Sequence, residues 1–142
     1  MKIFFAGPLT NLKDYKKTEA FYLQLAGVVK ECGHDYFWAF LNGTDPNVER
    51  DHTPQYVYET DTGNLKTSNL MIAYIGEPST GVGVEIEYAN THNIPVVVLY
   101  EKGNWTSRMA RGCPSIKKEI VFSSQDDACT QLKEYLVHFV KP

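Results

Sequence analysis

The chain has 142 residues, 43% of them hydrophobic and 22% charged, and this composition predicts one globular domain over residues 1–142. The formal net charge is −3 and no basic run occurs, which argues against a nucleic-acid-binding protein. Three cysteines without CxxC spacing and the lack of a long apolar stretch argue against a disulfide framework, a zinc site, a signal peptide or a membrane span, so we expect a cytoplasmic protein.

The N-terminal half of the sequence alternates short apolar runs with helical patterns. The run at 2–7 predicts a strand, and apolar residues at helical spacing from 21 to 32 predict a helix. The aromatic residues at 36–40 predict a second strand. Residues 41–54 combine glycine, proline and charges without periodicity, which predicts a loop, and a helix is expected over 55–67.

The C-terminal half continues this alternation. Nearly continuous apolar runs at 69–76 and 94–100 are typical of parallel strands buried on both faces, and a helix over 83–92 is expected to join them. Residues 119–122 predict a fifth strand, and a closing helix follows. Its apolar face carries Ala128, Leu132, Tyr135, Leu136 and Phe139. The whole pattern predicts a three-layer α/β domain, flavodoxin-like or Rossmann-like, with a five-stranded parallel sheet.

Ligands of such sheets bind beyond the carboxyl ends of the strands. That edge is expected to hold residues 7–11, 76–85 and 102–107, which makes Gly7 and Leu9 candidate substrate-binding residues. The turn Gly81-x-Gly83 matches part of the dinucleotide fingerprint GxGxxG. The match is weak, because Ile86 replaces the third glycine and the turn follows the third strand, so NAD is not expected.

Glu85 is expected near the start of the helix that follows this turn. Its plainest interpretation is a helix-start carboxylate, which the helix dipole stabilises by roughly 0.3–1 kcal/mol. Three features favour a catalytic interpretation. The residue lies at the ligand edge behind a small-residue turn, the helix start is expected to favour its ionised form, and Asp61 on the preceding helix supplies a second carboxylate. Two such carboxylates can cleave a glycosidic bond. Glu87, about 200° further around the helix, is expected to face solvent.

Several segments resemble the nucleoside 2-deoxyribosyltransferase superfamily, and within it the 2′-deoxynucleoside 5′-monophosphate N-glycosidases. They are "KIFFAGPL", "YETDTGNLKTSNLMIAYI", "PSTGVGVEIEYA" and "TSRMARG". The resemblance implies that Glu85 attacks the anomeric carbon and that Asp61 transfers a proton at the leaving base. It also implies a nucleotide substrate and no metal or organic cofactor.

Further roles follow from the same resemblance. Ser79 and Ser107 would bind the 5′-phosphate, Ser107 from the neighbouring subunit of a homodimer, with Gly81 and Gly83 forming the small-residue turn at the substrate. The transferase branch has an aspartate in place of Ser79. Arg111 falls on an arginine of the hydrolases, although a structural salt bridge is an equal alternative.

The sequence also departs from the family pattern. Phe4 replaces a tyrosine that orients the glutamate, which would leave an apolar surface near the sugar and admit a ribose 2′-hydroxyl. Thr10 replaces an arginine, Asn69 an aspartate and Glu87 a glycine. The last two changes put the substrate geometry in doubt more than the nucleophile.

The favoured hypothesis is an enzyme that hydrolyses the N-glycosidic bond of nucleoside 5′-monophosphates through a glutamyl intermediate. A nucleoside 2-deoxyribosyltransferase is the first alternative, and Ser79 argues against it. A nucleotide-binding sensor that has lost catalysis is the second, kept open by Phe4 and Asn69.

Overall fold

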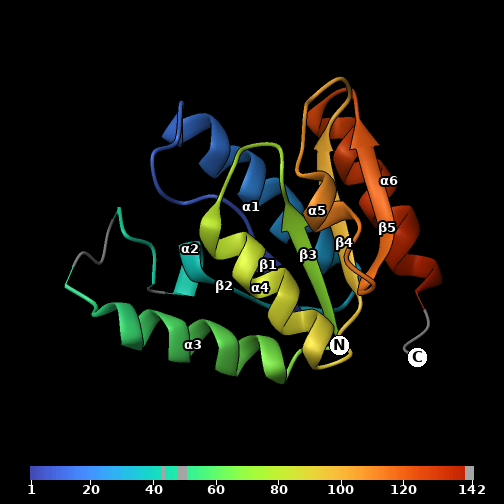
Figure 1. Cartoon of the computed structure of the whole chain (residues 1–142). Coiled ribbons are helices and arrows are strands. Elements are labelled where there is room, and N and C mark those ends of the chain that lie inside the picture. The colour runs from blue at the N-terminus through green and yellow to red at the C-terminus, as the bar shows by residue number, and fades with distance from the viewer. Residues whose placement is uncertain (43, 48–50, 140–142) are drawn as a thin grey trace.

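The computed structural model describes residues 1–42, 44–47 and 51–139 (Figure 1). Within these residues a single five-stranded sheet has the order β2-β1-β3-β4-β5, and all its pairings are parallel. The strands are β1 (Lys2–Ala6), β2 (Asp35–Trp38), β3 (Leu70–Tyr74), β4 (Val96–Glu101) and β5 (Ile116–Phe122). The predicted α/β fold with a five-stranded parallel sheet is confirmed.

Helices cover both faces of the sheet and make three layers (Figure 1). Helices α1 (Tyr15–Glu31) and α6 (Gln125–His138) pack on one face, and α3 (Pro54–Lys66) and α4 (Thr80–Thr91) pack on the other. The short helices α2 (Ala39–Asn42) and α5 (Arg108–Arg111) follow β2 and β4. Among the described residues, no helix combines the length and apolar character needed to cross a bilayer.

The core divides in two because side chains alternate along each strand. In β1, Ile3 and Phe5 join the cluster under α1 and α6, whereas Phe4 and Ala6 join the cluster under α3 and α4. Every residue of β3 is buried, as predicted for a central parallel strand with helices on both faces. The buried sheet therefore provides a rigid support for the residues at its carboxyl edge.

The second strand is shorter than predicted. Strand β2 ends at Trp38, and Ala39 and Phe40 already belong to α2. The strand propensity of aromatic residues does not mark where pairing stops, and the pairing with β1 ends at Phe5↔Trp38. The predicted loop 41–54 thus begins with the end of α2, and its residues 43 and 48–50 lie outside the described part of the chain.

Helix α4 begins three residues earlier than predicted. Ser79 is its N-cap and accepts a hydrogen bond from the backbone N–H of Val82 at 3.3 Å. Gly81 and Gly83 therefore lie inside the first turns of the helix rather than in a turn before it. Glu85 is consequently in the second turn, beyond the N–H groups that the helix start exposes.

Candidate active site

A cavity of about 180 Å³ lies at the carboxyl edge of the sheet, where β1, β2, α3 and the start of α4 meet. Crossovers to opposite faces of the sheet leave β1 and β3 at this point, and such switch points are the usual ligand sites of open α/β sheets. Six of the predicted site residues line the cavity: Gly7, Leu9, Asp61, Ser79, Gly81 and Glu85. The predicted catalytic carboxylates are thus brought together from two helices that pack side by side.

The surroundings of Glu85 disfavour its charge. Burial raises the pKa of Glu85 well above its ordinary value of 4.5, and the nearby carboxylate of Asp61 raises it further. Among the described residues, none donates a hydrogen bond to the Glu85 carboxyl group. The prediction that the helix start favours the ionised form is therefore wrong, because the residue sits one turn too deep in α4.

Asp61 projects from α3 and has one stabilising contact. Burial raises its pKa to about 6, and this shift is opposed by a hydrogen bond that the Thr44 hydroxyl donates to Asp61 Oδ1 at 3.2 Å. Since the charge on Asp61 raises the pKa of Glu85, the two groups titrate as a coupled pair. Burial therefore raises the pKa of both carboxyl groups, and the charge of each one disfavours the charge of the other.

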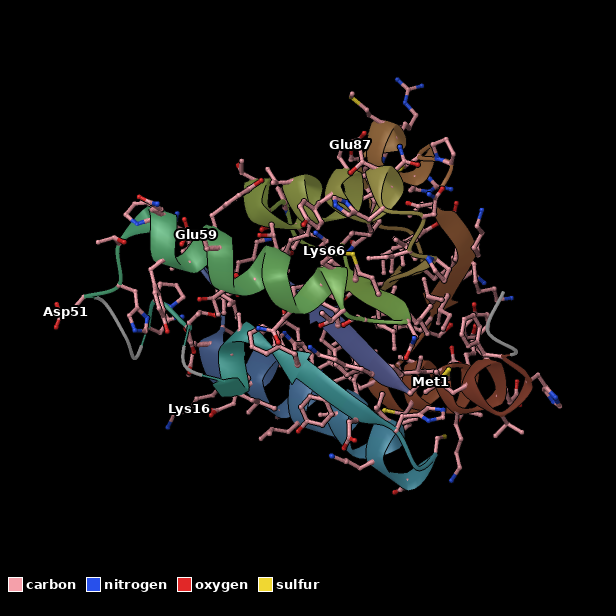
Figure 2. The ribbon with its side chains drawn as sticks, turned by 90° about the horizontal axis from the view of Figure 1, so that it is seen from below. Met1, Lys16, Asp51, Glu59, Lys66 and Glu87 are labelled. Carbon is pink, nitrogen blue, oxygen red and sulfur yellow. The ribbon has the colours of Figure 1, made fainter. Side chains whose placement is uncertain are left out.

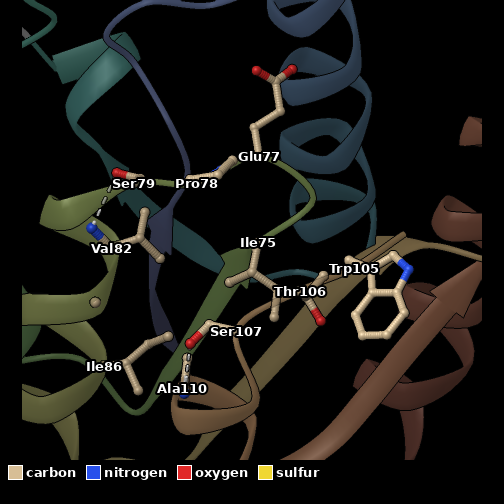
Figure 3. Close-up of a pocket in the computed structure, with 11 residues that line it drawn as sticks. Ile75, Glu77, Pro78, Ser79, Val82, Ile86, Trp105, Thr106, Ser107 and Ala110 are labelled. Carbon is tan, nitrogen blue, oxygen red and sulfur yellow. Dashed lines mark hydrogen bonds between the residues drawn. The ribbon is translucent and has the colours of Figure 1, made fainter. Parts of the chain in front are cut away.

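A second cavity, of about 360 Å³, also borders the start of α4 (Figure 3). Ser79 and Val82 line both cavities, and Gly83 and Ser107 line the second one. Ser107 caps α5 by accepting the backbone N–H of Ala110 at 3.2 Å, just as Ser79 caps α4. In each serine the hydroxyl oxygen accepts the hydrogen bond that caps the helix, and the hydroxyl proton remains able to form a hydrogen bond to a ligand.

Phe4 lies elsewhere. It is 0% exposed and stacks on Phe37 with a ring separation of 5.7 Å, in the core under α3 and α4. The prediction that Phe4 offers an apolar surface to the sugar is therefore not met. Its neighbour Phe5 lines the Asp61–Glu85 cavity instead.

Two other departures also lie away from the cavity. Asn69 accepts the backbone N–H of Lys2 at 3.0 Å, at the amino edge of the sheet, so it has no direct part in substrate geometry. Glu87 is exposed on the outer side of α4, as predicted (Figure 2). Thr10, in contrast, does line the cavity.

Two residues of the family pattern have structural explanations. Arg111 donates to Glu119 at 2.9 Å and lies over the Tyr100 ring, which is the salt-bridge alternative. Gly7 lies against the buried ring of Tyr22, and a Cβ atom at Gly7 would come within 2.7 Å of Tyr22 Cζ. The packing of α1 thus already requires a glycine here, whatever the site binds.

The sequence reasoning missed the residues behind Asp61. Thr44 and Asp45 follow α2 and are 4% and 1% exposed. Asp45 Oδ1 accepts the backbone N–H of Asn47 at 2.8 Å, which is an Asx-turn across Pro46. The tripeptide Asp-Pro-Asn is a typical signal for such a turn, but nothing in it shows that the aspartate is buried beside a cavity.

No family model matches the chain. A protein of Syntrophotalea carbinolica named "Putative 2′-deoxynucleoside 5′-phosphate N-hydrolase 1" is 32% identical over 141 residues, which cover 96% of this chain and 94% of that protein. The chain belongs to this family. A 2′-deoxynucleoside 5′-phosphate N-hydrolase relative of the same name from Methanosarcina mazei is 30% identical over 98% of this chain and 83% of its own length.

Solved structures show the same fold. The CMP N-glycosidase BcmB of Clostridium botulinum has a TM-score of 0.72 at 18% identity, over 95% of this chain and 99% of that one. A 2-deoxyribosyltransferase of Bacillus psychrosaccharolyticus has a TM-score of 0.67 at 21% identity, over 93% of this chain and 96% of that one. The predicted resemblance to the nucleotide N-hydrolase branch is confirmed by the relatives in sequence. The predicted fold, which this chain shares with the 2-deoxyribosyltransferase, is confirmed by the solved structures.

Proposed function

We propose that the protein hydrolyses the N-glycosidic bond of nucleoside 5′-monophosphates, giving a free base and a sugar 5-phosphate. The observation that carries this proposal is that Asp61 and Glu85 line one cavity, while Ser79, which lines that cavity too, also lines a second cavity together with Ser107. Glycosidic cleavage needs two carboxyl groups in different environments, one to attack and one to handle protons. The names of the relatives favour a 2′-deoxynucleotide as the first substrate to test.

A two-step retaining mechanism needs Glu85 ionised and Asp61 protonated when the substrate is bound. Burial raises the pKa of both groups, so each is suited to hold a proton. A proton that passes from Glu85 to Asp61 would produce the required state without exchange with solvent. Glu85 then bonds to the anomeric carbon, the bond to the base breaks, and its electron pair leaves with the base, which takes the proton from Asp61.

The second step regenerates the reactive state of the pair, with Glu85 ionised and Asp61 protonated. A water molecule attacks the anomeric carbon, the ester bond to Glu85 breaks, and Asp61 accepts the proton that the water gives up. The sugar phosphate then leaves. Asp61 is therefore the acid of the first step and the base of the second.

The second cavity is the proposed phosphate site. Ser79 and Ser107 present neutral hydroxyl donors there, and an aspartate in place of Ser79 would repel a phosphate group. Gly81 is exposed, and a Cβ at this position would have no heavy atom nearer than 3.9 Å. The fold does not need a glycine there, which is expected where a ligand approaches the backbone closely.

We further propose that the protein is a homodimer. Trp105 and Met109 are 97% and 91% exposed, and they flank Ser107 on the segment that carries α5. Two large apolar side chains left in water beside a cavity favour a partner surface. Because Ser107 lines the same cavity as Ser79 of its own chain, the partner subunit would cover this phosphate site and would not need to supply its own Ser107.

A panel of nucleoside 5′-monophosphates, each as the ribo and the 2′-deoxy compound, tests the proposed activity. Chromatography would follow the free base. We expect base and sugar phosphate from at least one 2′-deoxynucleotide, and a strict preference for deoxyribose would dispose of the ribonucleotide hypothesis. Adding a foreign base separates hydrolysis from transfer, because a transferase would yield an exchanged nucleoside. A panel without any base release would leave the sensor alternative.

A further inference from the structure

A buried aspartate lies directly behind the catalytic pair. Asp45 is 1% exposed, and three donors satisfy its carboxylate: the backbone N–H of Asn47 at 2.8 Å, Asn47 Nδ2 at 2.7 Å and the Tyr15 hydroxyl at 3.2 Å. Asn47 Nδ2 also donates to the carbonyl oxygen of Leu9 at 2.6 Å. Asp45 therefore ties the segment after α2 to the loop after β1 and to the first residue of α1.

The residue before it touches the catalytic pair. Thr44 is 4% exposed, and its backbone N–H donates to the carbonyl oxygen of Ala39 at 3.1 Å. Its hydroxyl donates to Asp61 Oδ1. Thr44 is thus anchored on one side by α2 and on the other by Asp45, with Asp61 as the partner of its side chain.

We propose that Asp45 is a positioning residue of the active site, which holds Thr44 where its hydroxyl group stabilises ionised Asp61. The proposal rests on the proposed function in so far as Asp61 is catalytic. Burying a carboxylate this deeply is unfavourable unless each of its oxygens accepts a hydrogen bond. An aspartate is therefore an energetically costly choice if position 45 serves only to fix a loop. A carboxylate is also acceptor-only, and it therefore fixes three donors in one orientation, which an asparagine cannot do.

The contact between Thr44 and Asp61 affects the pH at which Asp61 loses its proton. The titratable group that faces Asp61 across the cavity is Glu85 of α4, while Asp45 and Tyr15 lie behind Thr44. The Thr44 hydroxyl favours the charged form of Asp61 and so opposes the effect of burial. Without it, ionisation of Asp61 would move to higher pH.

The test is a ¹³C NMR titration of the Asp61 carboxyl group, alongside the pH profile of kcat/KM for base release. Variants Asp45→Asn and Thr44→Val should each move the Asp61 midpoint and the acidic limb of the profile upward by roughly one pH unit. Thr44→Ser, which keeps the hydroxyl group, should leave the Asp61 midpoint and the acidic limb where they are in the unaltered protein. Asp51→Asn is the matched control, because Asp51 is exposed in the same connection.

An unmoved Asp61 midpoint in folded Asp45→Asn and Thr44→Val would overturn the proposal. If Asp45→Asn does not fold, Tyr15→Phe replaces it, because it removes one donor from Asp45 and leaves the carboxylate; it should then move the midpoint in the same direction. The NMR titration needs no turnover. Absence of base release by the unaltered protein would therefore refute the proposed function and leave this inference to the titration.

Discussion

Glu85 and Asp61 share a cavity that disfavours charge on both, and the proposed reaction needs a charge on Glu85 only while the substrate is bound. Replacing Glu85 with alanine removes the nucleophile, so kcat should fall by at least about a thousandfold. The measurement is base release from the best nucleotide of the panel, with circular dichroism to verify the fold. Glu87→Ala, on the exposed side of the same helix, is the control and should keep its activity. Normal base release by Glu85→Ala would show that the nucleophile is wrongly assigned.

Asp61 should make the protein less stable as the pH rises. Its pKa is about 6 in the folded chain against an ordinary value of 3.8, so its favourable contribution is complete below about pH 4 and is lost as the pH rises through 6. At about 1.4 kcal/mol per pKa unit the full shift would correspond to about 3 kcal/mol, and because Asp61 is partly exposed and screened by solvent we expect a loss of about half of that at neutral pH.

Asp61→Asn removes this ionisation. We expect the variant to be more stable than the unaltered chain at pH 7 and equally stable at pH 4, although it should be inactive. Urea unfolding at a series of pH values measures both differences. Asp51→Asn, at an exposed position, should follow the unaltered chain throughout. An equal stability of Asp61→Asn and the unaltered chain at pH 7 would argue against the raised pKa.

At the scale of single elements, the first turn of α4 is the part of the molecule that the substrate is expected to approach. Gly81→Ala should stabilise the helix by up to about 1 kcal/mol, because alanine has the higher helix propensity and nothing in the protein obstructs its methyl group. The same methyl group would project toward the substrate, and kcat/KM should drop by at least about tenfold. Thermal unfolding and kinetics measure the two effects.

Gly63→Ala separates the two effects. Gly63 lies inside α3, and a Cβ there would have no neighbour within 4 Å. The variant should gain similar stability and keep full activity. A loss of activity in Gly63→Ala equal to that in Gly81→Ala would mean that helix rigidity, and not the approach of a substrate, explains the effect.

The sequence was sufficient for the types of the elements but not for their ends. The apolar runs predicted all five strands, because central parallel strands must be apolar on both faces. The start of α4 was missed, since glycines at 81 and 83 suggest a turn and the capping role of Ser79 depends on the geometry at that site. The sequence predicted β5 only from residue 119, whereas it begins at Ile116, because an edge strand also tolerates the exposed Lys117 and Lys118.

For the site, too, the sequence was sufficient for some features and not for others. Glu85 and Asp61 could be nominated because motif spacing is local, and the cavity brings them together. Their protonation could not be predicted, because it depends on burial and on each other's charge. The same holds for Asp45, whose donors come from residues 2 and 30 positions away. Phe4 was placed wrongly because its side chain lies on the face of β1 that α3 and α4 cover, where it is buried.

At the scale of the whole molecule, two cavities meet at Ser79 and Val82, at the start of α4. The cavity with Asp61 and Glu85 is lined by residues of two strands and three helices and by the segment after α2. The cavity with Ser107 is bordered by α5 and by Trp105, which is almost wholly exposed. A second copy packed on this side would cover Trp105 and the cavity beside it.

Replacing Trp105 and Met109 together with serine should therefore weaken the dimer. An exposed tryptophan at the centre of an interface contributes on the order of 2 kcal/mol or more, so we expect the loss of Trp105 alone to raise the dissociation constant by at least about thirtyfold. Sedimentation equilibrium measures the change. Base release should fall in parallel at concentrations where the variant is monomeric, and recover when the protein is concentrated. Val137→Ser, at a 66% exposed position on α6, should leave both unchanged. A monomer of the unaltered chain with full activity would refute the dimer.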